Sequence, residues 1–290
     1  MTTAPEASEH IGYASAKGVA TITLDRPGSG NAVTGPMTAT LIGRVAEAAA
    51  DDDVRVVIIR ATGRHFCVGV DLAAHGHLSA PRREAIQGWP RERGGAYALA
   101  VLGLRKPVVS VVQGAAVGFG ATLTLPTDIR IVGESARFAF PFVRRGITPE
   151  AVSTWLLPRV VGQGRASDWM LTGRMVGSAE AHAAGLASRV VPDDELDGVA
   201  RSVAEDLAEQ CAPAALAATR FMLWSMLGAA DPWQAHRLES EFMSKLSGGA
   251  DSAEGFASFL EKRSPQFGRV PDGFFTASHA WPAEPDDLDV

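Results

Sequence analysis

The feature that most constrains this chain is a pattern that occurs twice: an apolar strand runs into a glycine-containing turn, and the turn leads into a helical pattern. The nearly continuous apolar runs 54–59 and 107–112 are typical of strands buried on both faces of a sheet. The turns that follow them are Gly63–Leu72 and Gln113–Leu123. Repetition of strand, turn and helix predicts an α/β fold with mostly parallel strands.

The segments on either side extend this pattern. Alternating apolar residues predict a strand over Val19–Leu24. A helix is expected to follow, with Thr34 as its N-cap and Pro36 in its first turn. Four apolar residues at helical spacing form the stripe that this helix should bury, namely Met37, Leu41, Val45 and Ala48. Beyond Leu156, helical patterns cover 164–172, 178–184, 195–210, 213–227, 232–246 and 252–263, with a strand at 188–191.

Three parts of the chain follow from these patterns. The α/β core is expected to span residues 1–191, and a helical segment residues 192–265. Residues 266–290 are rich in proline, glycine and acidic residues, so we expect this tail to be poorly ordered.

Composition excludes several classes of protein. The chain has 290 residues, of which 46% are hydrophobic and 21% are charged, as is usual for a soluble protein with a large core. Its net charge of −6 argues against a nucleic-acid partner. No apolar run reaches the roughly 20 residues of a membrane span, and the polar N-terminus lacks a signal-peptide pattern. Cys67 and Cys211 are too few for a disulfide framework or a metal cluster, so we expect a cytoplasmic protein without a bound metal.

The two glycine turns are candidates for anion binding. The start of a helix exposes backbone N–H groups that have no partner and carry partial positive charge. Two such groups that converge would hold an oxyanion. The spacing Gly114-x-x-x-Gly118-x-Gly120 also resembles the dinucleotide turn of short-chain dehydrogenases. That family pairs the turn with Tyr-x-x-x-Lys after it, which this chain lacks, so we expect no nicotinamide cofactor.

Taken together, these stretches resemble the crotonase (enoyl-CoA hydratase/isomerase) superfamily, over roughly residues 10–265. The matching pieces beyond the two turns occur in family order. They are Asp25-Arg-Pro, Asn31-Ala-Val, Asp128-Ile-Arg, Ser135-Ala-Arg-Phe, Leu157-Pro-Arg-Val-Val-Gly162, Leu171-Thr-Gly-Arg, Ala184-Gly-Leu and Val190-Val-Pro-Asp.

The resemblance implies a crotonase-like spiral of ββα turns and C-terminal helices that assemble a homotrimer or a dimer of trimers. It implies an acyl-CoA thioester as substrate, with no further cofactor. By position, the backbone N–H groups of Val70 and Phe119 would form the oxyanion hole, with Val68 and Gly118 beside them. Asp71 either contacts the substrate or caps the helix that follows.

The chain departs from typical hydratases of this family, which carry two glutamates that activate water. Those positions hold Thr122 and Phe142, so the ordinary two-glutamate mechanism is not available. Glu150, in Gly146-Ile-Thr-Pro-Glu150, stands where hydratases usually have glycine. The Phe-Pro-Phe142 segment, the Ala-Val-Gly turn and this single glutamate resemble the peroxisomal-type Δ3,Δ2-enoyl-CoA isomerases.

Glu150 is therefore the predicted base that moves a proton from C2 to C4 of a 3-enoyl-CoA. The pocket is expected to include Phe142 and Trp155, and burial should raise the pKa of Glu150. Glu150 could instead be only a first-turn acid favoured by the helix dipole. Thr122 either contacts substrate or packs its helix, and Lys262 either reaches the CoA phosphates or ends a solvated helix.

Two other functions stay open at this point. One is an enoyl-CoA hydratase that works with Glu150 alone. The other is a catalytically silent subunit that binds acyl-CoA. His65, His75 and His77 could line the acyl pocket or be solvated, and Cys67 is expected to be a core residue and not a nucleophile.

Overall fold

The computed structural model describes residues 10–73, 85–86, 89–90 and 92–282. A six-stranded sheet forms its centre, in the order β1-β2-β3-β6-β8-β11. The strands of this sheet are β1 (Ile11–Ala16), β2 (Val19–Leu24), β3 (Val56–Ala61), β6 (Val108–Val112), β8 (Ile129–Gly133) and β11 (Arg189–Val191). Only β1 and β2 pair antiparallel in it, and the other neighbours are parallel. The predicted α/β fold with mostly parallel strands is confirmed.

Two smaller sheets accompany the large one. One has the order β10-β9-β7, with β7 (Ala115–Val117), β9 (Arg137–Ala139) and β10 (Val176–Gly177). The other pairs β4 (Ala85–Ile86) with β5 (Trp89–Pro90). The strand β7 directly follows the turn after β6, so the second glycine turn continues into a separate small sheet.

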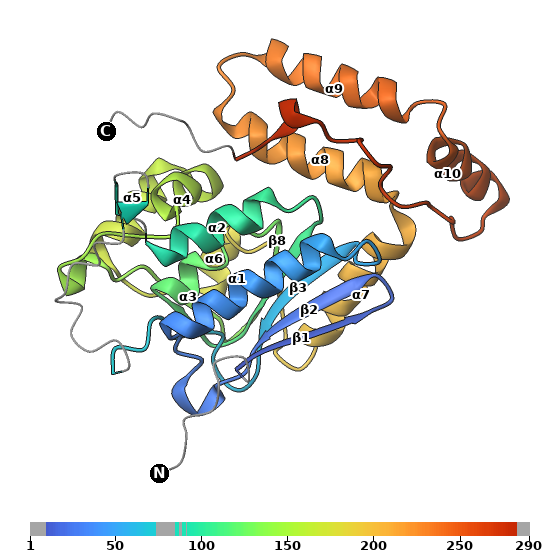
Figure 1. Ribbon diagram of the computed structural model, residues 1–290. Helices are drawn as coiled ribbons and strands as arrows, with labels where there is room; N and C mark the ends of the chain where they lie inside the picture. The colour runs from blue at the N-terminus through green and yellow to red at the C-terminus, as the bar shows by residue number, and fades with distance from the viewer. Residues whose placement is uncertain (1–9, 74–84, 87–88, 91, 283–290) are drawn as a thin grey trace.

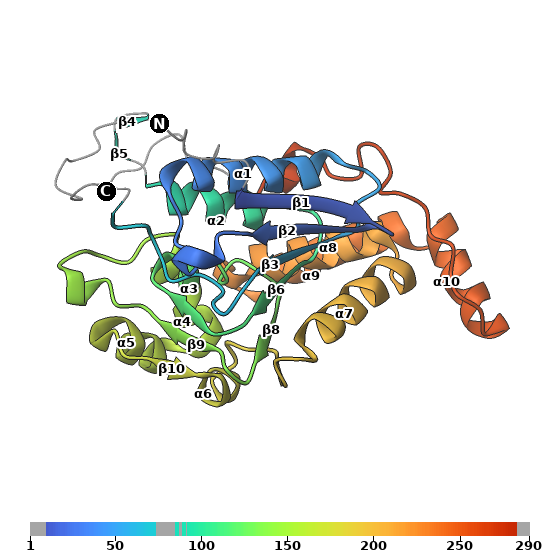
Figure 2. The same cartoon turned by 90° about the horizontal axis from the view of Figure 1, so that it is seen from below.

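Helices cover both faces of the large sheet (Figures 1 and 2). The helices of the core are α1 (Gly35–Ala50), α2 (Arg93–Gly103), α3 (Phe119–Thr122), α4 (Ser153–Val161), α5 (Gln163–Thr172), α6 (Ser178–Ala183) and α7 (Leu196–Gln210). Side chains of β3 alternate between the two layers: Val57 and Ile59 join the cluster that includes α1 and α2, whereas Val56 and Ile58 pack against α7. This alternation explains why the strand is apolar on both faces.

The start of α1 agrees with its sequence prediction. The Thr34 side chain accepts a hydrogen bond from the backbone N–H of Met37, and a proline lies in the first turn. The predicted stripe is buried along its whole length, as Met37, Leu41, Val45 and Ala48 show. The N-cap hydroxyl accepts a hydrogen bond from one of the backbone N–H groups that have no partner at the helix start. Burial of the apolar stripe stabilises the packing of the helix on the core.

The boundary expected near residue 192 differs in the structure, because α7 belongs with the core. Its small side chains Ala200, Ala204 and Ala208 are buried against the large sheet. The chain leaves the core only after α7, through α8 (Pro213–Ser225), α9 (Pro232–Leu246) and α10 (Ala250–Glu261). Figure 1 shows these three helices beside the core and beyond the layer that α1 and α2 form.

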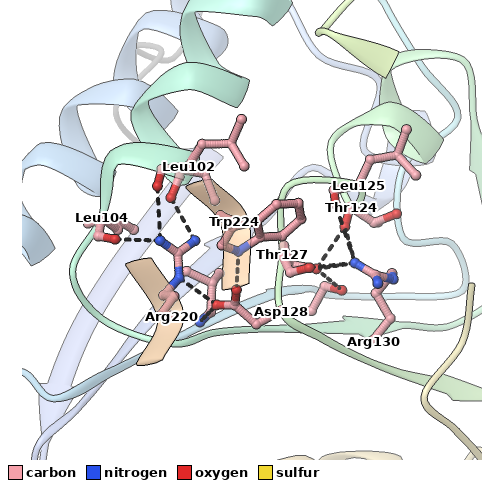
Figure 3. A network of polar contacts seen from close by, with 12 residues as sticks. Leu102, Leu104, Thr124, Leu125, Thr127, Asp128, Arg130, Arg220 and Trp224 are labelled. Atoms are coloured by element: carbon pink, nitrogen blue, oxygen red, sulfur yellow. Dashed lines mark hydrogen bonds and ion pairs between the residues drawn. The ribbon is translucent and has the colours of Figure 1, made fainter. Parts of the chain in front are cut away.

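A buried polar network fastens α8 to the core (Figure 3). Arg220 Nε donates to Asp128 Oδ2 at 2.7 Å, and its Nη1 donates to the Leu102 carbonyl at 3.0 Å. Trp224 Nε1 donates to the other oxygen of Asp128 at 2.5 Å. Because Asp128 begins the segment leading into β8, this network links the C-terminal helices to the central sheet.

The tail differs from the expectation of poor order over residues 268–282. Phe274 is buried with Phe221 of α8 and Phe242 of α9, and His279 is 1% exposed. Trp281 packs against the core. Aromatic burial outweighs the proline- and glycine-rich composition here. The last eight positions, 283–290, lie outside the described residues.

Candidate active site

The two glycine turns lie against each other. Cys67 of the first turn donates its N–H to β7 at 3.0 Å and accepts a hydrogen bond from β7 at 2.9 Å. A Cβ atom on Gly120 would lie 2.1 Å from the Cys67 carbonyl oxygen, and one on Gly69 would lie 4.0 Å from the Phe119 nitrogen. Glycine is therefore required where the backbones approach, since a side chain would separate the turns.

Asn31 holds the first turn in place from the β2–α1 connection. Its side-chain amide donates to the carbonyls of Thr62 and His65 at 2.8 and 2.7 Å. Its oxygen accepts the Arg26 N–H at 2.7 Å. The side chain is fully buried, and the family-like Asn31-Ala-Val piece thus has a structural role in this chain.

The backbone amides of Val70 and Phe119 are the predicted donors of the oxyanion hole. Phe119 is the first residue of α3, after Gly118 with φ 56° and ψ −120°, so its N–H has no partner within the helix. Within the described part of the chain, neither amide donates to another residue. The approach of the two turns brings both amides to the same region, which is consistent with the predicted oxyanion hole.

The residues beside these amides leave room next to them. A Cβ atom on Gly118 would have no heavy atom within 4 Å, and the Val68 side chain is 39% exposed. The Phe119 ring is buried and packs edge-on against Tyr97 of α2, with ring centroids 6.1 Å apart. The core thus accommodates the Phe119 ring beside its own backbone amide.

Glu150 lies next to the end of α3. Thr122 Oγ1 is 2.5 Å from Glu150 Oε1 and 3.2 Å from the Phe119 carbonyl oxygen. The hydroxyl group has one proton, which the shorter contact directs to the carboxyl group. The two residues that sequence reasoning singled out separately are therefore partners, and α3 connects them to the amide of Phe119.

Burial dominates the protonation of this carboxyl group. Desolvation raises the pKa of Glu150 to about 8, opposed by the Thr122 hydrogen bond and reinforced by the nearby Glu92. A carboxyl group with this pKa can accept and return a proton near neutral pH. The rise in pKa agrees in direction with the prediction from an apolar pocket.

The backbone that carries Glu150 is strained. Ala151 and Val152 both have φ of 57°, in the left-handed region that residues other than glycine rarely adopt. For the β-branched Val152 this is a pronounced outlier. Ser153 then begins α4, with its N–H bonded to the Glu150 carbonyl at 3.1 Å. Strain of this kind is concentrated at functional sites, which adds support to Glu150.

Sequence reasoning missed Glu92, which precedes α2. Its Oε1 accepts a hydrogen bond from the Ala151 N–H at 3.0 Å, and its carboxyl group lies close to that of Glu150, beside Gly94. The segment around it has no clear periodicity. The signal that could have found it is the pair Gly94-Gly95, which begins two residues after Glu92. Two glycines in the first helical turn are unfavourable unless another group needs the space.

Phe142 and Trp155 are close in sequence to Glu150, and the structure gives their contacts. Phe142 is buried in the main core. The Trp155 ring packs on Trp281 of the tail, with centroids 6.4 Å apart, and Arg159 lies 4.0 Å above it. Their predicted contact with substrate stays a prediction.

The structure shows the contacts of Asp71 and the place of Lys262, which ends a solvated helix as one of its two predicted roles stated. Asp71 forms an ion pair with Arg26 at 2.6 Å and accepts the Ala73 N–H, and no helix starts at Leu72 or Ala73. These contacts hold the first turn. Lys262 ends α10, which lies at the opposite end of the molecule from α3 and α4 in both views (Figures 1 and 2). Within one chain it is therefore remote from Glu150.

Other candidate groups have structural partners. His65 Nδ1 accepts the Ala115 N–H at 3.1 Å, whereas His75 and His77 lie outside the described residues. Burial raises the pKa of Cys67 to about 12, so its side chain is a neutral thiol, in agreement with a core role. Among the described residues, no three His, Cys, Asp or Glu side chains are grouped to hold a metal ion. None of the described helices is both long and apolar enough to cross a membrane.

Comparisons with known proteins place this fold and site in one class. The enoyl-CoA hydratase/isomerase family matches residues 14–270. An enoyl-CoA hydratase of Alternaria alternata is 39% identical over 254 residues, 87% of this chain and 83% of the relative. The 1,2-epoxyphenylacetyl-CoA isomerase of Escherichia coli is 35% identical over 258 residues, 87% of this chain and 95% of the relative.

Solved structures agree with this result. The crystal structure of an enoyl-CoA hydratase from Bacillus anthracis superimposes with a TM-score of 0.81 at 27% identity, covering 89% of this chain and 98% of the other. The chain belongs to the enoyl-CoA hydratase/isomerase family, and the crotonase fold predicted from its motifs is confirmed.

Proposed function

We propose that this protein acts on an enoyl-CoA thioester and that Glu150 is the base that moves a proton on its acyl chain. The single observation that carries the proposal is the position of Glu150. Its carboxyl group is hydrogen-bonded to Thr122 at the end of α3, the helix whose first amide is a predicted oxyanion donor. The base and the oxyanion hole would thus be held by one short element.

The reaction that fits one such base is the 3-enoyl to 2-enoyl isomerisation. Ionised Glu150 removes a proton from C2, and the electron pair moves toward the thioester oxygen. The N–H groups of Val70 and Phe119 would stabilise the negative charge on that oxygen, by about 3 kcal/mol for each donor. Protonated Glu150 then returns the proton to C4, which leaves the double bond between C2 and C3.

Hydration of a 2-enoyl-CoA is the second candidate, and the names of the relatives favour it. Several are called enoyl-CoA hydratases, including the Alternaria alternata proteins, and one is called an isomerase. In this reaction Glu150 would activate water for addition at C3. The side chains that weigh toward isomerisation are Thr122 and Phe142, because neither can take the place of a water-activating glutamate.

Two substrates separate these reactions. Isomerisation predicts that 3-hexenoyl-CoA is converted to the conjugated 2-enoyl product, followed by ultraviolet absorbance. Hydration predicts that crotonyl-CoA is converted to a 3-hydroxyacyl product, followed by loss of the same absorbance. A silent binding subunit would bind both thioesters, convert neither, and exchange no α-protons in deuterated water.

The variant Glu150→Gln tests the assigned base. We expect it to lower kcat by about 10²–10⁴-fold on the active substrate, the range that general acid–base catalysis contributes. Glu239→Gln on α9 is the matched control and should retain full activity, since Glu239 is exposed on a helix away from the site. Near-normal turnover by Glu150→Gln would refute the assignment.

We also propose that the protein assembles as a homotrimer or a dimer of trimers. Support comes from large apolar side chains exposed on the C-terminal helices, including Leu223 at 69%, Phe256 at 72% and Phe259 at 80%. Exposed apolar side chains that gather on one part of a surface mark protein contacts. Light scattering on the purified protein should give the mass of three or six chains, and a monomer mass would contradict the proposal.

A further inference from the structure

Glu92 and Glu150 occupy space that a side chain at Gly94 would otherwise fill. A Cβ atom on Gly94 would lie 1.7 Å from Glu150 Oε2 and 2.9 Å from Glu92 Oε2. One on Gly95 would lie 2.4 Å from Glu92 Oε1. The two glycines at the start of α2 thus make room for two carboxyl groups from segments almost sixty positions apart in the sequence.

The nearness of these carboxyl groups has a direct electrostatic consequence. Two carboxylates that share a site cannot both ionise easily. The negative charge of Glu92 therefore favours the protonated form of Glu150 and raises its pKa.

Glu92 also fixes the loop that carries the base. Its Oε1 accepts the N–H of Ala151, the residue directly after Glu150 and one of the two with left-handed φ. The strained conformation needs outside support to persist, and this hydrogen bond supplies part of it. One side chain thus contacts both the carboxyl group and the backbone of the catalytic segment.

We propose that Glu92 is a positioning residue for the catalytic base: it holds the loop at Ala151 and places a second carboxyl group beside that of Glu150. This inference rests on the proposed function of Glu150. Glu92 is exposed whereas Glu150 is half-buried, so burial adds to the effect of Glu92 and disfavours the charged form of Glu150.

The other groups around Glu150 do not replace this role. Thr122 of α3 donates a hydrogen bond and favours the ionised form. Cys67 of the first turn is close enough for Glu150 to raise its thiol pKa, and this thiol is neutral. Arg93 of α2 extends toward Gly35 at the start of α1, where a Cβ atom would lie 2.3 Å from its Nη1. Among the described residues, Glu92 is the charged group placed beside Glu150 at Gly94.

The variant Glu92→Gln separates the charge of Glu92 from its support of the loop. Its amide oxygen can still accept the Ala151 N–H, while the negative charge is lost. The loss of this charge favours ionised Glu150. The titration of the Glu150 carboxylic acid band, measured by infrared difference spectra against Glu150→Gln, should move downward by about one pH unit or more. This readout needs no substrate.

Kinetics provide the second measurement. The rising limb of kcat/KM against pH, which reports the free enzyme's base, should move downward by the same amount. Glu92→Ala should move it likewise and also lower kcat, because the hydrogen bond to Ala151 is lost. Glu209→Gln, at an exposed position on α7, removes one charge elsewhere and should leave both curves unchanged.

The proposal would be overturned if Glu92→Gln and the unchanged protein had the same infrared titration and the same pH profile. If Glu92→Gln did not fold, Glu92→Ala would give the same infrared test. Failure of the proposed function has a different outcome: Glu150→Gln would keep its activity, whatever the infrared titration shows. The two failures are therefore distinguishable.

Discussion

Two groups of buried polar side chains in this molecule are built in opposite ways. Around Arg220 and Asp128, charges of opposite sign meet, and backbone carbonyls accept the remaining guanidinium protons. Around Glu150, a second carboxyl group lies nearby, beside Gly94, and the backbone after Glu150 has left-handed φ. In the first arrangement the charges have partners, and in the second the charged form of one carboxyl group is made unfavourable.

The difference follows from what each group connects. Arg220 joins α8 to the segment that leads into β8 and to the end of α2 (Figure 3), so its role is to hold two parts of the fold together. Glu150 connects no distant elements except through Thr122 and Glu92. A carboxyl group whose pKa lies near neutral pH costs folding free energy but is suited to proton transfer. We infer that the first group serves stability and the second serves chemistry.

The largest effect that would test this comparison is expected at Arg220. Arg220→Met keeps an apolar stem but leaves Asp128 and several carbonyls without their partner. Removing one member of a buried ion pair costs about 3–5 kcal/mol of unfolding free energy, which urea denaturation measures. Residual folded protein should keep the pH profile of the unchanged enzyme, since the network does not contact Glu150.

Arg174 is the matched control for this variant. It also bridges two carboxylates, Asp168 and Glu180, but at the surface. Exposed pairs contribute about 0–1 kcal/mol. Arg174→Met should therefore lose much less unfolding free energy than Arg220→Met. Equal losses of unfolding free energy in the two variants would show that the buried ion pair stabilises the fold no more than the exposed one.

Local sequence predicted the parts of the fold that depend on local rules. The Thr34 cap, the stripe of α1 and the doubly buried β3 follow from capping and periodicity. The place of α7 did not follow, because an amphipathic pattern shows that a face is buried but not what covers it. The order of the tail did not follow either, since the burial of Phe274 depends on α8 and α9.

The candidate site shows the same limit. Thr122 and Glu150 could be singled out by position, but their hydrogen bond joins residues 28 apart in sequence and depends on how α3 meets the loop before α4. Glu92 lay in a segment with no periodic pattern. The sequence shows the pair Gly94 and Gly95 but not the reason for it. The reason is that carboxyl groups fill the space beside these glycines, and only the tertiary structure shows this.

The smaller expected effect concerns the stability that Glu150 removes from the fold. Its pKa is about 8 in the folded protein, whereas an unperturbed glutamate titrates near about 4.3. The folded state therefore binds the proton more tightly, and stability falls as pH rises between these two values. Glu150→Gln cannot ionise, so its unfolding free energy should exceed that of the unchanged protein increasingly from pH about 5 to 8, by about 2–4 kcal/mol at the upper end.

Urea denaturation at a series of pH values measures this difference. Glu239→Gln should give a difference that stays constant with pH, because that carboxyl group is exposed. A difference that stays constant for Glu150→Gln as well would mean that Glu150 ionises at its ordinary pH in the fold. The contrast with Arg220 would be established if the gain in unfolding free energy of Glu150→Gln grew with pH while this variant lost activity. The charge of Glu150 would then lower stability, whereas the charge of Arg220 maintains it.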